Sequence, residues 1–311
     1  MTFRIPLILT GLLAMACAPV ATAGVIRHDV PDSLYRALAA ESRYSGVGDV
    51  LIRANSGTTR CSGTLIDASW VLTAAHCLDN AGTSSITYKA GGVTYSAASW
   101  VYHNAFNESS LLAGYDIGLI NLATAVSGVE VAKLYTGVDE VGLVGTSVGF
   151  GTTGTGLTGY ANGTSGTKRA GNNVIESFIN GALLWADFDN GSASANLFGD
   201  SAQLDLEYMI APGDSGGGTF INIDGVDYLA GVHSFIGDAS GDGKYATYGD
   251  FQGSTRVSSF VDWIENTTGL EFAGSGTGTE TGTVPTAPTL ALILVGLLSA
   301  RRMRRAEDQR A

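Results

Sequence analysis

The sequence predicts an all-β protein that ends in a single helix. Glycine accounts for 43 of the 311 residues, and threonine, serine and valine are common, a composition typical of turn-rich sheets. From Val47 onward, apolar stretches such as VGDVLIR, SWVLTAA and ASWVYH are separated by clusters of glycine, serine, threonine and asparagine. These stretches have the length of strands, and no ten-residue segment between Ser45 and Gly253 follows a clear helical period.

The helix is predicted over residues 257–268, where Phe260, Val261 and Ile264 share one helical face and Gly269 can end it. Residues 149–171 are rich in glycine and threonine and form either a linker between two lobes or a long surface loop. We favour the loop, because the stretches on both sides look like strands.

Residues 1–23 are predicted to be a signal peptide that directs export. Arg4 precedes an apolar run over residues 5–16, and the small residues ATA end at Ala23. A lipoprotein signal at Cys17 is the alternative, but an alanine stands where such a signal usually has leucine.

The chain is predicted to end in a linker over residues 273–288 and an apolar helix with an arginine cluster over residues 289–305. As a helix, Val284 to Ala300 would span about 25 Å, against a hydrocarbon core of about 30 Å. The order of Val-Pro, apolar helix and arginines resembles the PEP-CTERM sorting signal of Gram-negative bacteria, without its usual glutamate, since this chain has VPTAP. A simple tail anchor is the alternative, and membrane contact is expected only through this tail.

The formal net charge of −12, with no lysine or arginine cluster before the last dozen residues, gives nucleic-acid binding no electrostatic support. Cys17 would leave with the signal peptide, so Cys61 and Cys77 are predicted to form one disulfide in an oxidising compartment. A catalytic cysteine is a poor alternative, because neither thiol has an evident activating partner.

Few side chains can act as a general base, since the chain has four histidines: His28, His76, His103 and His233. His76 has the most informative position, at the end of the apolar stretch SWVLTAAHC and next to a predicted disulfide cysteine. Asp116 opens the apolar stretch DIGLINL, where a buried carboxylate would need donors such as an imidazole N–H. An exposed aspartate in a turn is the alternative.

The stretch MIAPGDSGGG surrounds Ser215 with glycines. Glycines permit strained backbone angles and close approach of a substrate, so the N–H groups of Gly213 and Ser215 could bind a developing oxyanion. Serine also needs a base such as His76, itself oriented by a carboxylate such as Asp116. Taken alone, the stretch is also consistent with a plain hairpin or an anion-binding nest.

TAAHC, DIGLINL and GDSGG, in this order, resemble the trypsin/chymotrypsin family of serine endopeptidases, over about residues 47–264. The resemblance implies that His76 is the general base, Asp116 its orienting carboxylate and Ser215 the nucleophile, with Gly213 and Ser215 as the oxyanion hole. It also implies two six-stranded antiparallel β-barrels. The expected organisation is an N-terminal segment at 24–46, a protease domain at 47–272, barrels at about 47–145 and 146–256, and the closing helix.

The resemblance also bears on substrate binding. VHSF resembles the segment that pairs with the substrate backbone, so Ser234 is expected beside the P1 residue and the neighbouring His233 is expected to be structural. Met209 stands six residues before Ser215, where trypsins carry an aspartate, so a small or apolar P1 residue is favoured over arginine or lysine.

The family's IVGG start is absent, so the partner of Asp214 is left open. It is either an ammonium supplied by processing at Gly24 or Ile26, or another group.

The predicted function is therefore an exported serine endopeptidase that acts through an acyl-enzyme on Ser215. A catalytically silent protease-fold binding protein at the cell surface is the alternative, and an esterase is a third possibility. No cofactor or metal is expected, because Asp238 and Asp242 in GDASGDG are better explained by a solvated turn than by a calcium site. The expected partners are polypeptide substrates, signal peptidase and a C-terminal sorting protease. The protein is expected to be a monomer in the periplasm, at the cell surface or outside the cell.

Overall fold

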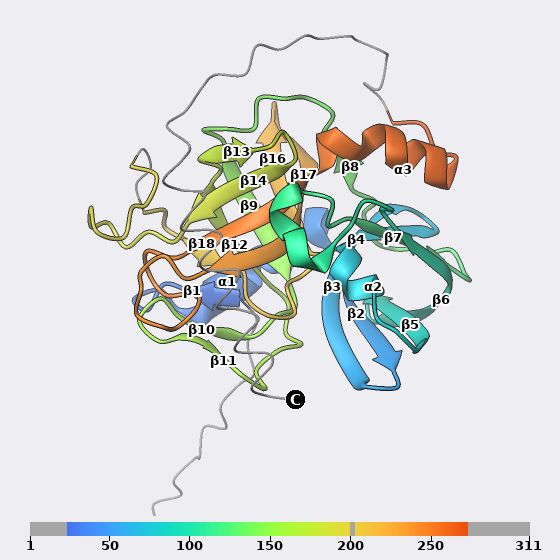
Figure 1. Cartoon of the computed structure of the whole chain (residues 1–311), viewed down its shortest axis with the longest axis horizontal. Helices are drawn as coiled ribbons and strands as arrows, with labels where there is room; N and C mark the ends of the chain where they lie inside the picture. Colours follow the sequence, from blue (N-terminus) through green and yellow to red (C-terminus); the bar gives the residue numbers. More distant parts are fainter. Residues whose placement is uncertain (1–23, 200–202, 273–311) are drawn as a thin grey trace, which may run out of the picture.

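The computed structural model describes residues 24–199 and 203–272 as two β-sheet lobes side by side (Figure 1). The predicted signal peptide, linker and C-terminal apolar helix lie outside the described residues. Within the described residues, no helix combines the length and the apolar character needed to cross a bilayer.

The first lobe is a closed antiparallel barrel whose strands neighbour one another in the order β2-β3-β4-β7-β6-β5. Fully buried aliphatic side chains such as Val50, Leu72 and Leu119 fill its interior and form its main stabilising contacts. The strands are β2 (Val47–Ala54), β3 (Gly57–Asp67), β4 (Trp70–Thr73), β5 (Thr83–Ala90), β6 (Val93–Tyr102) and β7 (Gly118–Leu122).

The second lobe is a sheet whose described strands are hydrogen-bonded in the order β12-β9-β16-β17-β18-β14-β13, with β8 added in parallel to β17. The predicted all-β fold is confirmed, with a closed six-stranded ring in the first lobe and an antiparallel series in the second. The strands are β8 (Lys133–Leu134), β9 (Val144–Gly149), β12 (Arg169–Val174), β13 (Ser177–Ile179), β14 (Leu183–Asp187), β16 (Gly218–Ile223), β17 (Val226–Gly237) and β18 (Phe251–Arg256).

A small third sheet joins the start of the described chain to the second lobe. Its order is β11-β10-β1-β15, and the strands are β1 (Gly24–Ile26), β10 (Thr153–Thr155), β11 (Gly159–Ala161) and β15 (Tyr208–Met209). The hairpin β10–β11 belongs to the glycine-rich segment 149–171. Because β9 and β12 pair directly at the two ends of this segment, it is a loop between neighbouring strands and not a linker between lobes.

Helices are short and lie around the sheets. They are α1 (Asp32–Ala39), α2 (Ala75–Leu78) and α3 (Val261–Thr268), with a 3-10 turn at Val257–Phe260 leading into α3. Gly269 ends α3 with a φ of 71°, in the left-handed region that favours glycine. The sequence did not predict α1, because its eight residues make only about two helical turns, too short a stretch to establish a period.

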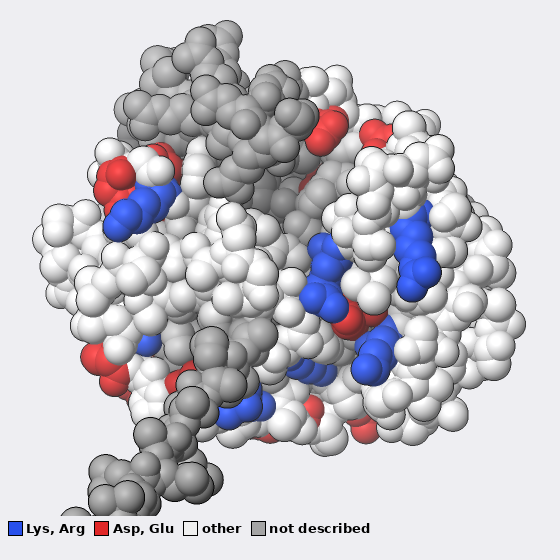
Figure 2. Space-filling view, turned by 90° about the horizontal axis from the view of Figure 1, so that it is seen from below, with Lys and Arg blue, Asp and Glu red and all other residues white. Residues whose placement is uncertain are grey.

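Charged side chains are scattered over the face seen in Figure 2, where acidic and basic groups stand among uncharged ones.

Candidate active site

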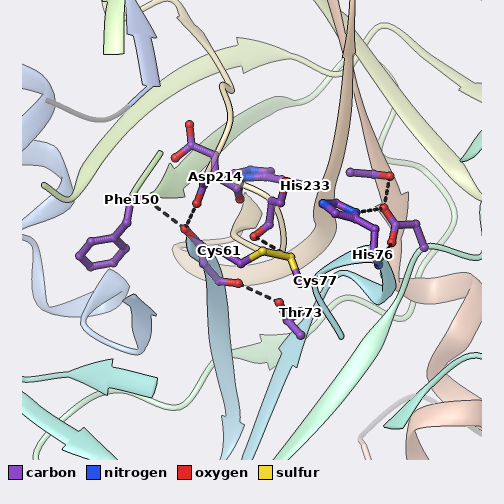
Figure 3. The surroundings of a disulfide bond; sticks show 12 residues. Cys61, Thr73, His76, Cys77, Phe150, Asp214 and His233 are labelled. Carbon is purple, nitrogen blue, oxygen red and sulfur yellow. Dashed lines mark hydrogen bonds and ion pairs between the residues drawn. A yellow bond between two sulfur atoms is a disulfide. The ribbon is translucent and has the colours of Figure 1, made fainter. Parts of the chain in front are cut away.

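His76 is held at the junction of β4 and α2. The neighbouring Cys77 forms a disulfide with Cys61 on β3, as predicted, and Thr73 at the end of β4 donates a hydrogen bond of 2.8 Å to the carbonyl of Ser62 (Figure 3). The chain that carries His76 is therefore fixed to β3 on both sides, which leaves the imidazole little freedom to move.

Asp116 is fully buried just before β7 and binds His76 at two points. Its Oδ1 accepts the main-chain N–H of His76 at 2.9 Å, and its Oδ2 lies 2.7 Å from Nδ1 of the imidazole (Figure 3). An ionised carboxylate only accepts hydrogen bonds, so Nδ1 carries the ring proton and Nε2 carries the lone pair. This is the tautomer that a general base needs.

The second lobe completes the surroundings of Asp116. Ser234 Oγ donates to Asp116 Oδ2 at 2.5 Å, and Thr255 Oγ1 on β18 donates to the Asp116 carbonyl at 2.8 Å. Burial by itself raises the pKa of Asp116, but the positive charge of His76 when its ring is protonated, together with the hydrogen bonds from His76 and Ser234, outweighs burial and lowers the pKa. Asp116 is therefore ionised, and it joins the two lobes.

Ser215 approaches the same place from the second lobe. Its carbonyl oxygen accepts the main-chain N–H of Ser62 at 2.8 Å and lies 3.8 Å from Sγ of Cys77, the residue after His76. The main chain of Ser215 therefore lies against the disulfide beside His76. Cys77 and Ser215 are 138 positions apart in the sequence, and the motifs that carry them meet in the fold.

The main chain around Ser215 leaves two donors available. The N–H groups of Asp214, Gly216 and Gly217 donate to carbonyls at 2.9, 2.8 and 2.8 Å, whereas those of Gly213 and Ser215 make no hydrogen bond to any described residue. Gly213 and Gly216 have φ angles of 98° and 80°, which favour glycine. Within the described residues, the N–H groups of Gly213 and Ser215 thus have no main-chain or side-chain acceptor, and a pair of such donors is what the binding of an oxyanion needs.

The comparisons with known proteins agree with this geometry. The family model described as Trypsin matches residues 41–264, which is more than half of the chain. The chain belongs to the trypsin family. It is 32% identical over 223 residues to brachyurin from Leptuca pugilator, covering 68% of this chain and 88% of that protein. It is 26% identical over 260 residues to chymotrypsin-like elastase family member 1 from Bos taurus, covering 77% of this chain and 92% of that protein.

The solved structure of HL collagenase has the same fold, with a TM-score of 0.56 at 21% identity, covering 75% of this chain and 97% of that chain. The mostly-β architecture of this trypsin-family chain is thus shown by its structure and by a solved neighbour.

In this trypsin-family chain, Asp214 is buried and accepts main-chain hydrogen bonds from Gly151 and Ala211 at 2.8 and 2.9 Å. Burial raises its pKa to about 7 despite these hydrogen bonds. No ion pair joins Asp214 to any residue in the described part of the chain. Pairing of Asp214 with an ammonium at Gly24 or Ile26 stays a prediction.

Ser234 and His233 lie at an irregularity in β17, where the register with β18 shifts between His233 and Phe235. Such a bulge re-aims a side chain, and here the hydroxyl of Ser234 reaches Asp116. The sequence predicted Ser234 beside the substrate but gave no signal for this contact, since one extra residue in a strand leaves no pattern. His233 is fully buried, its Nδ1 lies 3.2 Å from the Asp214 carbonyl, and burial lowers its pKa to about 4.

The carboxylates predicted to form a solvated turn each hold their own turn. Asp242 is exposed, as predicted, and accepts the Lys244 N–H at 2.8 Å, whereas Asp238 accepts the Gly241 N–H at 2.7 Å but is buried, which the prediction of a solvated turn did not foresee.

A different acidic group, missed by the sequence analysis, comprises Glu176, Asp187 and Asp189, which are buried and present carboxylate oxygens within 4.8 Å of one another. Glu176 stands on a different segment from Asp187 and Asp189, so the sequence spacing of the three residues gives no metal-binding motif.

Proposed function

We propose that this protein is an exported serine endopeptidase. In this proposal His76 is the general base, Asp116 orients it and Ser215 is the nucleophile. The observation that carries the proposal is the two-point hydrogen bonding of His76 to the buried Asp116, with the main chain of Ser215 packed against the neighbouring disulfide. Membership of the trypsin family supports the same assignment.

The reaction follows from the protonation states. His76 Nε2 takes the proton of the Ser215 hydroxyl as the oxygen attacks the peptide carbonyl, and Asp116 stabilises the imidazolium that forms. The negative oxygen of the tetrahedral intermediate is bound by the N–H groups of Gly213 and Ser215. The imidazolium then gives its proton to the leaving amine, which breaks the peptide bond and leaves an acyl-enzyme. Water activated by His76 hydrolyses this ester and restores the serine.

The P1 residue is proposed to be other than arginine or lysine, because a buried methionine, Met209, offers no charge to bind a cation. Export is supported by the disulfide, which requires an oxidising compartment. The roles of residues 1–23 as signal peptide and of the C-terminal tail in sorting or anchoring belong to the same proposal, as does the monomeric state.

The test is covalent labelling with a fluorophosphonate, followed by cleavage of a peptide library. The wild-type protein should be labelled and should cleave peptides, and Ser215→Ala should abolish both. Ser99→Ala, at an exposed position on β6, is the matched control and should keep both. A wild-type protein that binds peptides but is neither labelled nor able to cleave them would instead establish the catalytically silent binding protein.

A further inference from the structure

The carbonyl oxygen of Asp214, the residue before the proposed nucleophile, is held by two donors. It accepts the main-chain N–H of Gly217 at 2.8 Å and lies 3.2 Å from Nδ1 of His233, whose ring stands beside Asp214 in Figure 3. A carbonyl oxygen only accepts hydrogen bonds, so Nδ1 carries the ring proton and donates it to Asp214. Because a carbonyl oxygen has two lone pairs, both of its accepting positions are used.

This carbonyl belongs to the same peptide unit as the N–H of Ser215. The peptide is trans, so its C=O and its N–H point in opposite directions. Holding the Asp214 oxygen on one side therefore aims the Ser215 N–H to the other side, where it makes no hydrogen bond to any described residue. Turning this N–H away would rotate the peptide unit and break both hydrogen bonds to the Asp214 oxygen. The two donors thus fix the direction of one N–H group of the proposed oxyanion hole.

The imidazole of His233 is itself fixed against the loop that carries Ser215. The main-chain N–H of His233, on β17, donates to the Gly217 carbonyl at 2.9 Å, and the His233 carbonyl accepts the N–H of Gly216 at 2.8 Å. A Cβ added at Gly217 would lie 2.9 Å from Nδ1 of His233, closer than an ordinary contact, so a glycine at residue 217 leaves room for the ring. The ring is also fully buried, so it cannot exchange Asp214 for water.

Packing alone does not explain a histidine at this buried position. Its other ring nitrogen, Nε2, is buried and has no hydrogen-bond partner among the described residues. An unsatisfied buried acceptor is destabilising, and a leucine side chain would fill a similar volume without it. Burial lowers the pKa of His233 to about 4, so at neutral pH the ring holds one proton, which the Asp214 carbonyl retains on Nδ1. The side-chain hydrogen bond that His233 gains is therefore the one to Asp214.

We propose that His233 is a positioning residue of the oxyanion hole, which acts through the Asp214 carbonyl to keep the N–H of Ser215 aimed at the developing oxyanion. This inference rests on the proposed endopeptidase activity at Ser215. Because the oxyanion forms only as the peptide carbonyl is attacked, loss of the His233 donor should affect the transition state more than substrate binding.

The test is kcat and KM for peptide cleavage by two variants of His233. His233→Leu keeps a similar volume but removes the donor, so it should lower kcat by at least about tenfold with little change in KM. His233→Asn is smaller, but its side-chain nitrogen is bonded to Cγ as Nδ1 is, so it keeps a donor for Asp214. Its kcat should stay within about threefold of the wild-type value.

The stabilities of the two variants separate positioning from packing. In urea unfolding His233→Asn should be the less stable variant, because it leaves the larger cavity, although it should be the more active one. A purely structural role predicts instead that activity follows stability. The matched control is Tyr88→Phe, which removes a buried hydroxyl that donates to the Gly46 carbonyl at 2.7 Å in the first lobe. It should lower stability and leave kcat unchanged.

A measurement on the wild-type protein covers the case in which neither variant folds. Two-bond ¹H–¹⁵N NMR spectra of protein labelled with ¹⁵N-histidine report which ring nitrogen carries the proton. His233 is recognised as the histidine that stays neutral down to about pH 5, because its pKa lies near 4. Its proton should be on Nδ1, and a proton on Nε2 would overturn the inference.

A wild-type protein that is labelled by fluorophosphonate, together with a folded His233→Leu variant whose kcat lies within about threefold of the wild-type value, would overturn the inference and leave the endopeptidase proposal standing. A folded His233→Asn variant that is no more active than His233→Leu would do the same. A wild-type protein that is neither labelled nor active on any peptide would overturn the endopeptidase proposal itself, and the inference with it.

Discussion

Reducing the disulfide between Cys61 and Cys77 should lower the free energy of unfolding by about 3 kcal/mol. The bridge closes a loop with a sequence separation of 16 residues. For a loop of this length, the chain-entropy relation gives about 10 cal/mol/K of entropy removed from the unfolded state, or about 3 kcal/mol at room temperature. The loop contains β4 and the residue His76, so the same reduction should also loosen the imidazole.

The assay is urea unfolding followed by tryptophan fluorescence, with and without a thiol reductant. The wild-type protein should lose about 3 kcal/mol on reduction. The control is Cys61→Ala combined with Cys77→Ala, whose unfolding should not respond to the reductant. A loss below about 1 kcal/mol in the wild-type protein, or an equal loss in the double variant, would refute the loop-entropy reasoning.

Three further predictions address the site and its pH dependence. Gly216→Ala should destabilise the protein by about 3 kcal/mol in urea unfolding, because the φ of residue 216 is 80° and an added Cβ would lie 2.0 Å from Thr73 Oγ1. Gly225→Ala is the control, because residue 225 has a φ of 83° but open space around it, and it should destabilise by only about 1–2 kcal/mol. Equal losses of stability in the two variants would contradict the crowding argument. Asp116→Asn should lower kcat about 10⁴-fold in peptide assays, because an amide facing Nδ1 favours the wrong tautomer of His76, and a loss below about tenfold would remove Asp116 from its role. Glu207→Gln should weaken the pH dependence of stability in urea titrations between about pH 5 and about pH 8. Burial, aided by neighbouring carboxylates, raises the pKa of Glu207 to about 9 in the folded protein. The stability that its proton contributes is therefore fully present below the ordinary pKa of about 4.5 and falls by up to about 1.4 kcal/mol per pH unit as the pH rises towards 9. An identical slope in the variant would contradict this.

The features predicted well from the sequence are those encoded in short segments. The disulfide was predicted from two cysteines in a chain expected to be exported, and the glycines around Ser215 indicated a main chain that bends tightly. His76 and Asp116 stand next to apolar strands, where a polar side chain is buried only if it has hydrogen-bond partners. Each of these signals lies within a sequence separation of 16 residues or fewer.

The contacts that could not be predicted depend on how strands pair. The hydrogen bond from Ser234 to Asp116 follows from a register shift between β17 and β18. Likewise the acidic group of Glu176, Asp187 and Asp189 forms only when separate segments meet. Register is set by the packing of the whole sheet, so a sequence window does not contain it.

Asp116 belongs to the first lobe by sequence but is held by both lobes, through His76 on one side and through Ser234 and Thr255 on the other. A chimera that exchanged an entire lobe with a relative would preserve each hydrophobic interior and still break this junction. In such a chimera the position of the crossover therefore matters less than the few polar side chains around Asp116. These side chains come from both lobes and must be taken from the same parent.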